Sequence, residues 1–164
     1  MRRIVSDTGP LITLEKLTDG YTFIRALYDQ VVIPASVLRE LTDGGPESYL
    51  AHFAIEDLVL IADEPVRRRE VESLDRLDAG EQDAIQVALD LGLPLLIEEE
   101  MGRRVARSAG LKISGIAGQI GRAAHEGHIP TESAQRYLKQ LYGERRINRR
   151  VFEAVLNHVE QNAG

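Results

Sequence analysis

The chain has 164 residues, a length that fits one domain with a core of its own. It contains no cysteine, which excludes disulfides, thiolate metal ligands and cysteine nucleophiles. Its uncharged apolar runs are shorter than the roughly 20 residues that a membrane helix needs, and Asp7 interrupts the first residues too early for a signal peptide. We therefore expect a cytoplasmic protein without a membrane segment.

Charge is distributed unevenly along the chain. The whole sequence holds 20 basic and 26 acidic residues, and its net charge of −6 by itself disfavours a nucleic-acid binder. Residues 1–100, however, hold 9 basic and 21 acidic residues, whereas residues 101–164 hold 11 and 5. This asymmetry points to an anionic partner near the C-terminal part, although uneven solvated helix faces explain it equally well.

Short apolar runs alternate with segments of helical periodicity. In chain order we predict a strand over 3–6, helices over about 11–17 and 21–28, a strand over 31–33, a helix from Pro34 to Leu41, a strand over 58–61, helices over 66–76 and 79–91, a strand over 95–97, a helix to about 109, a strand over 112–114, and helices over 115–126, 131–142 and 148–162. This alternation predicts one α/β domain whose mostly parallel sheet is covered on both faces.

Acidic residues directly follow two of the predicted strands. Asp7 comes after the first strand, and Glu98, Glu99 and Glu100 come after the strand over 95–97. In open α/β sheets, ligands bind beyond the carboxyl ends of strands, where the strand order reverses. The acids would share one crevice if these strands are neighbours. Each also has a structural explanation, because Asp7 suits a helix N-cap and acidic residues suit the first turn of a helix.

Further acidic residues lie on predicted helices. Glu40 borders the apolar face of its helix, where pairing with a neighbouring residue is the ordinary role. Glu81 fits a capping box with Asp78, yet it aligns with the apolar positions of the helix over 79–91. A carboxylate on an inward face is costly unless it meets a cation or hydrogen bonds. Asp83 lies on a different side of that helix and is the weaker candidate.

Four segments occur in order at sensible spacing: IVSDTGPLI at 4–12, VVIPASVLREL at 31–41, LDAGEQDAI at 77–85 and LPLLIEEEMGRRVARSAGL at 93–111. Together with ISGIAGQIGRAAHEGHI at 113–129, this series resembles PIN-domain proteins, in particular the VapC-like branch of toxin–antitoxin ribonucleases. The resemblance covers about residues 3–130. It implies a three-layer α/β/α fold, an acidic pocket for Mg²⁺ or Mn²⁺, endonucleolytic cleavage of RNA, an antitoxin protein as partner, and homodimers.

The resemblance also assigns roles to individual positions. It implies catalytic roles for Asp7, Glu40, Glu81 and Glu99, with Asp7 and Glu99 as direct metal ligands and Glu98 as the flanking acid that could replace Glu99. Thr8 matches a hydroxyl position beside the first aspartate. Arg103, Arg104 and Arg107, on the helix that leaves the site, are candidates for contacts with RNA phosphates; pairing with Glu99 and Glu100 on the helix surface is the alternative.

One feature departs from the family pattern. The family usually has aspartates after the fourth strand, where this chain has glutamates, and Mg²⁺ demands near-octahedral geometry. A catalytically degenerate PIN-like module that binds RNA or protein is therefore the alternative function. A phosphatase of another α/β family would need a second aspartate two residues after Asp7, and Gly9 stands there.

Overall fold

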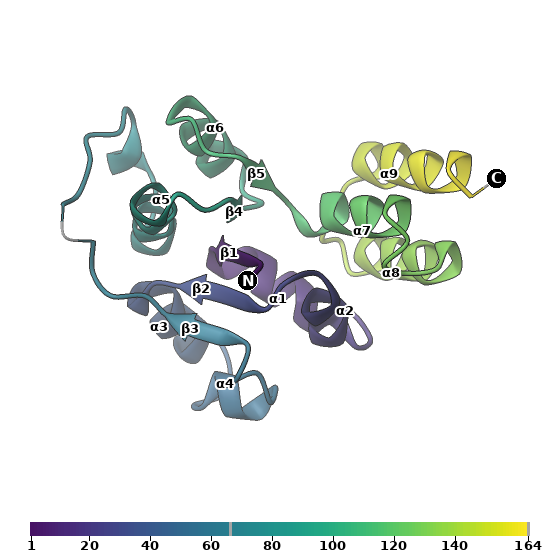
Figure 1. The fold of residues 1–164 in the computed structure, drawn as a ribbon, viewed down its shortest axis with the longest axis horizontal. Coiled ribbons are helices and arrows are strands. Elements are labelled where there is room, and N and C mark those ends of the chain that lie inside the picture. The colour runs from purple at the N-terminus through teal and green to yellow at the C-terminus, as the bar shows by residue number, and fades with distance from the viewer. Residues whose placement is uncertain (66, 164) are drawn as a thin grey trace. The chain divides into compact units, whose positions relative to one another are not determined.

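A parallel sheet forms the centre of the fold. The computed structural model describes residues 1–65 and 67–163, and within them the strands form one five-stranded sheet in the order β3-β2-β1-β4-β5 (Figure 1). The strands are β1 (Arg3–Ser6), β2 (Gln30–Ile33), β3 (Val59–Ile61), β4 (Leu95–Leu96) and β5 (Ile113–Ser114). Each neighbouring pair is parallel. The predicted α/β class with a parallel sheet is confirmed.

Helices connect and flank the strands. They are α1 (Thr8–Glu15), α2 (Gly20–Leu27), α3 (Ala35–Asp43), α4 (Tyr49–His52), α5 (Ala79–Leu91), α6 (Glu100–Ser108), α7 (Ile116–His125), α8 (Thr131–Gly143) and α9 (Arg149–Gln161). Apart from the short α4, each was predicted to within a few residues. Gly92 ends α5 as predicted, since its φ of 64° lies in the left-handed region that glycine adopts without strain.

The predicted helix over 66–76 is wrong for the residues that the structure describes. Residue 66 lies outside them, residues 67–71 form no helix, and a 3-10 turn covers only Leu74–Arg76. The backbone of Arg69 makes its hydrogen bonds with the buried side-chain amide of Gln86 on α5, at 2.9 Å and 2.7 Å. Residues 67–71 therefore form no helix, and at Arg69 a tertiary partner on α5 satisfies both backbone groups.

The described part of the chain divides into two compact units. The first comprises Met1–Ile12 and Tyr28–Ser114, which include the sheet. Its core joins β1, β2 and β4 to α5 and α6 through buried apolar side chains: Val5, Val32, Ala84, Ile85, Ala88, Leu95, Ile97, Val105 and Ala106. Helices α5 and α6 thus cover one face of the sheet, whose strand ends carry the predicted acids. That the chain is a single domain stays a prediction.

The second unit, Thr13–Leu27 with Gly115–Gly164, contains α2, α7, α8 and α9. Phe23 of α2 packs against Tyr137 of α8 with ring centroids 5.4 Å apart, and Leu138, Leu141 and Val159 are buried. The helices of this unit therefore share an apolar core of their own. Within residues 1–65 and 67–163, no helix is both long and apolar enough to cross a membrane.

Candidate metal centre

Strands β1 and β4 lie side by side, and the strand order reverses between them. Ser6 pairs with Leu96, and the Asp7 backbone N–H donates to the Leu96 carbonyl oxygen at 3.0 Å. Asp7 therefore leaves β1 where the chain leaves β4 toward Glu98. The predicted site required these two strands to be neighbours, and they are. The Asp7 side chain is only 5% exposed, so its carboxylate faces the protein interior.

Glu40 reaches this strand edge from α3. The Thr8 hydroxyl donates to Glu40 Oε2 at 2.5 Å, and the Gly80 backbone N–H donates to Oε1 at 3.0 Å. A Cβ atom at residue 80 would lie 2.6 Å from both carboxylate oxygens, so a larger residue there would displace the Glu40 carboxylate from this position. These contacts hold Glu40 next to Asp7. They also give Thr8 a role in orienting Glu40, whereas its predicted contact with RNA stays a prediction.

Asp78 joins the cluster, although its position in the sequence did not predict a metal ligand. Asp7, Glu40 and Asp78 each offer a carboxylate oxygen, and these oxygens lie within 4.8 Å of one another. The predicted capping box of α5 is confirmed, because Asp78 Oδ1 accepts from the Glu81 N–H at 2.8 Å. The predicted N-cap role was a sufficient explanation for an aspartate at this position. A metal role could still have been considered, because capping uses one carboxylate oxygen and leaves the second for a cation.

Glu81 occupies the inward face of α5, as its alignment with Ala84 and Ile85 predicted. It is 6% exposed, and its Oε2 has no hydrogen-bond partner among the described residues. A Cβ atom at Gly102 of α6 would collide with this oxygen and with the Ile97 side chain. Burial raises the pKa of Glu81 to about 8, and its hydrogen bond and charge repulsion with Asp78 add to the increase.

Asp7 is electrostatically the centre of the cluster. Burial raises its pKa to about 7, a hydrogen bond from the Thr8 backbone opposes that rise, and repulsion from Asp78, Glu40 and Glu98 adds to it. Its Oδ1, like Glu81 Oε2, has no hydrogen-bond partner in the part of the chain that the structure describes. An unpartnered carboxylate oxygen in a protein interior is costly unless a cation or a proton compensates it.

The two glutamates after β4 have different environments. Glu98 is half-buried and contributes to the raised pKa of Asp7, so its charge is felt inside the cluster. Glu99 is exposed and is the N-cap of α6, where its Oε2 accepts from the Gly102 N–H at 2.9 Å. The role of Glu99 as a direct ligand stays a prediction, and Glu98 lies in the better electrostatic position to support the site.

The three arginines of α6 also differ from one another. Arg103 is half-buried and donates to the Ile97 carbonyl oxygen at 2.9 Å, and burial lowers its pKa. Arg104 pairs on the surface with Glu100 at 3.5 Å, as the alternative reading expected. Arg107 is exposed. Their contacts with RNA stay predictions.

The residues fit a divalent metal ion. Buried oxygens of Asp7 and Glu81 have no hydrogen-bond partner among the described residues, and Glu40 and Asp78 approach Asp7 closely. A group of carboxylates without thiolate or imidazole suits hard cations such as Mg²⁺ and Mn²⁺. Such an ion would compensate the burial and the charge repulsion that together raise the pKa values of Asp7 and Glu81. The geometry and the donor set define an acidic site of the kind that metal-dependent hydrolases place at the switch point of a parallel sheet.

Comparison with known proteins gives the family. A family model described as a PIN domain matches residues 3–161, so the chain belongs to the PIN-domain family. A PilT N-terminus domain protein from the hyperthermophilic archaeon Sulfolobus solfataricus P2 has a similar fold, with a TM-score of 0.52 and 18% identity over 71% of this chain and 87% of that one. No curated protein matches the chain. PIN domains are generally nucleases and typically use divalent metal ions.

Proposed function

We propose that this protein is a metal-dependent endoribonuclease that hydrolyses RNA phosphodiester bonds. The observation that carries the proposal is a pair of buried oxygens, Asp7 Oδ1 and Glu81 Oε2, that have no hydrogen-bond partner in the described part of the chain. They lie with Glu40 and Asp78 at the point where the strand order reverses. A protein with only a structural use for this edge gains nothing from keeping carboxylates buried there. The family membership supports the same conclusion, because PIN domains are generally nucleases.

The residues divide the work between them. Asp7, Glu40 and Asp78 would hold Mg²⁺ or Mn²⁺, which supplies Lewis-acid activation of the phosphodiester and neutralises its charge when bound. Thr8 and the Gly80 N–H orient Glu40, so this carboxylate is already in place. Glu81, with its raised pKa, sits where a carboxylate can hold or accept a proton near neutral pH. Glu98 would add a further carboxylate to the site, and Glu99 would do so if it no longer capped α6.

The biological setting is a further part of this proposal. Because the sequence resembles the VapC-like branch, we propose that the protein is the toxin of a toxin–antitoxin pair, controlled by an antitoxin protein and active as a homodimer in the cytoplasm. Co-expression with the product of an adjacent small gene, followed by growth measurement and co-purification, tests this part separately from the chemistry. Growth arrest that the adjacent gene does not relieve would contradict it.

Manganese binding is the most direct test of the site. Isothermal titration of the full-length protein with Mn²⁺ should show saturable binding, and Asp7→Asn should remove it because the substitution keeps the side-chain shape but deletes the central charge. Asp90→Asn removes an exposed carboxylate from the same helix that carries Glu81, and it should bind Mn²⁺ like the wild type. Equal binding by wild type and Asp7→Asn would refute the site.

Cleavage is measured on the same proteins. A mixture of structured and unstructured RNAs, incubated with Mn²⁺ or Mg²⁺, should be cut by the wild type and by Asp90→Asn. A protein that binds Mn²⁺ at Asp7 but cuts none of these RNAs would favour the degenerate binding module instead. The two outcomes separate the metal site from the reaction that it serves.

A further inference from the structure

An exposed aromatic pair lies at the junction of α8 and α9, in the second unit. The rings of Tyr142 and Phe152 are stacked, with centroids 4.8 Å apart and an interplanar angle of 14°. Tyr142 nevertheless remains 42% exposed, which makes it one of the few large hydrophobic residues on the surface. Stacking on Phe152 covers one ring face, so the remaining surface of Tyr142 is open to a further planar group.

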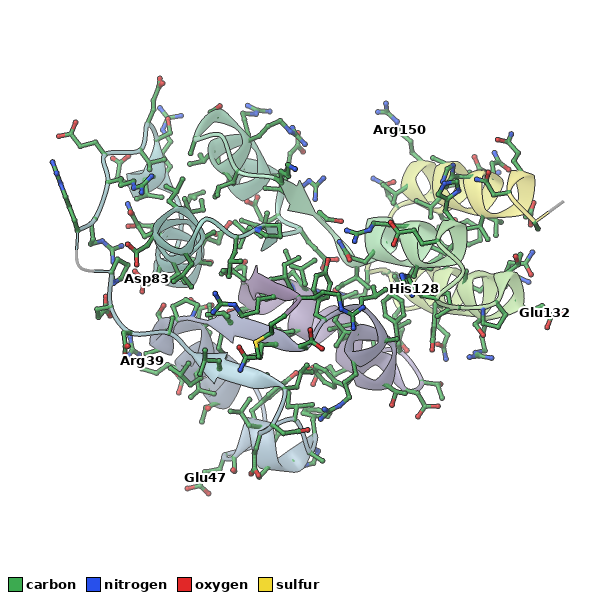
Figure 2. The ribbon with its side chains drawn as sticks, viewed as in Figure 1. Arg39, Glu47, Asp83, His128, Glu132 and Arg150 are labelled. Carbon is green, nitrogen blue, oxygen red and sulfur yellow. The ribbon has the colours of Figure 1, made fainter. Side chains whose placement is uncertain are left out.

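Arginines lie between the two residues of this pair in the sequence. The segment 142–153 holds four arginines and two glutamates in a chain whose net charge is −6. Arg149 pairs with Glu153 at 2.9 Å, and its pKa is raised first by that hydrogen bond and also by the nearby Tyr142. Arg145 and Arg150 are exposed and make no ion pair within the described residues, and Figure 2 shows Arg150 extending away from α9. We call Tyr142, Phe152, Arg145, Arg149 and Arg150 the Tyr142 patch.

The backbone at Arg145 shows that local stability does not explain this residue. Its φ of 59° lies in the left-handed region, which disfavours residues with a Cβ atom and favours glycine or asparagine. An arginine at this position is costly, and its guanidinium gains no ion pair in return among the described residues. Asp19, Ala54 and Ser73 adopt the same conformation, so the strain at Arg145 supports a function only together with the exposed ring and the arginines beside it in the sequence. A solvated helix start would explain the charges of the segment but not the strain or the exposed ring.

An exposed aromatic ring, with arginines near it in the sequence that make no ion pair with any described residue, has the chemistry of a surface that binds single-stranded nucleic acid. Bases stack on aromatic rings whatever their identity, while arginines pair with the phosphates that connect them. A duplex hides its bases from such a ring, and an acidic or apolar protein partner would leave either the ring or the charges without a matching group. The combination therefore favours an unpaired polynucleotide strand.

We propose that the Tyr142 patch binds single-stranded RNA, with a base stacked on Tyr142 and neighbouring phosphates paired with Arg145 and Arg150. The choice of RNA over DNA rests on the proposed function, whereas the stacking and the phosphate contacts do not. Binding at this patch needs no metal ion. It can therefore be measured in EDTA, where failure of the nuclease proposal has no influence on the result.

The experiment uses the full-length protein in EDTA and a fluorescein-labelled octaadenylate RNA, with a 16-base-pair RNA duplex for comparison. Anisotropy should show that the single strand binds more tightly per nucleotide. Tyr142→Ala should weaken that binding on the order of tenfold, as loss of one base–aromatic stack does, while Tyr142→Phe should retain it. Arg145→Asn and Arg150→Gln should each lower the slope of log affinity against log salt by about 0.7.

Two controls separate binding from folding and from general charge. Arg136→Gln removes an arginine from α8 whose guanidinium lies over Tyr137, outside the patch, and it should leave octaadenylate affinity within about twofold of the wild type. Arg145→Asn should raise the melting temperature, because asparagine tolerates the left-handed conformation, although it weakens binding. A variant that is more stable yet binds less RNA excludes unfolding as the cause.

Three outcomes would overturn the proposal. The first is octaadenylate affinity that Tyr142→Ala leaves unchanged. The second is tighter binding of the duplex than of the single strand. The third is a change of oligomeric state in Tyr142→Ala, measured by sedimentation, that accounts for the loss of RNA binding; this result would identify the patch as a protein interface.

Discussion

The two compact units of this protein carry opposite chemistry. The first unit contains eleven basic and nineteen acidic residues, and its acidic side chains converge at one edge of the sheet. The second contains nine basic and seven acidic residues, and four of its arginines lie within residues 145–150, between the two stacked aromatic residues in the sequence. The net charge of the whole chain describes neither unit, because it averages a site suited to cations with a surface suited to anions.

The units also differ in how they treat polar groups. In the first unit, the carboxylates of Asp7 and Glu81 are buried and each has an oxygen without a hydrogen-bond partner among the described residues, which is costly in the absence of a cation. In the second unit no described charged residue is buried, and Arg145 has a left-handed backbone, as Asp19 does. The first arrangement makes the stability of the metal-free protein sensitive to pH and to metal, whereas the second affects it only slightly.

Substitution of Asp7 tests the first unit most severely. Asp7→Asn should lower the rate of RNA cleavage by at least about 100-fold, since even substitutions around metal ligands reduce activity 10- to 100-fold. The measurement is single-turnover cleavage in Mn²⁺, with circular dichroism to confirm the fold. Cleavage at the wild-type rate would show that the buried acids are structural. The first unit would then hold no cation site to contrast with the second unit.

The stability of the metal-free protein should decrease as pH rises. The pKa of Asp7 is about 7 in the folded state and 3.8 in the unfolded state, so between these pH values the folded state binds the extra proton. The free energy of unfolding is therefore greatest at the acidic end of this window, and it falls until the pH exceeds the pKa of Asp7 in the folded state. A shift of this size corresponds to a loss on the order of 4 kcal/mol.

Urea denaturation in EDTA between pH 5 and pH 8 measures this decrease, and repeating it in Mn²⁺ should reverse most of the loss at pH 8. The Asp7→Asn protein lacks the titrating group and should show a shallower dependence on pH. A wild-type curve that is flat, or that rises toward pH 8 in EDTA, would contradict the assignment of Asp7 as a buried acid.

Glycine substitutions compare the packing of the two units. A Cβ atom at Gly102 would collide with the Glu81 carboxylate and Ile97, so Gly102→Ala should destabilise the protein by about 1–3 kcal/mol and weaken Mn²⁺ binding. At Gly143, near the end of α8, a Cβ atom meets no other atom within 4 Å. Gly143→Ala should be neutral or stabilising by up to about 1 kcal/mol. Urea denaturation of both variants measures whether each substitution lowers or raises the free energy of unfolding.

The two glutamates after β4 provide the smallest and finest test. Glu98→Gln should weaken Mn²⁺ binding about tenfold, because the charge of Glu98 acts on Asp7. Glu99→Gln should change it by less, since Glu99 is exposed and a glutamine oxygen can still cap α6. Titration calorimetry on both variants measures the difference. A larger loss of Mn²⁺ affinity in Glu99→Gln than in Glu98→Gln would indicate that Glu99 is a direct ligand.

Much of the fold could be predicted from local pattern. Apolar runs of three or four residues between helical segments identified the parallel sheet, and the capping box of Asp78 and Glu81 identified the start of α5. The predicted helix over 66–76 failed where a distant side chain decided the outcome, because Gln86 binds the backbone of Arg69. Local propensity contains no information about such a partner.

For the site, sequence pattern alone predicts that acids follow two strands and occupy the inward side of a helix. Which of these acids meet depends on contacts between distant parts of the chain. Sheet order places β4 beside β1, the absence of a Cβ atom at Gly80 admits Glu40, and the turn before α5 brings Asp78 within reach of Asp7. These are contacts between residues far apart in the chain, and their geometry depends on how strands and helices pack, which no spacing along the sequence specifies.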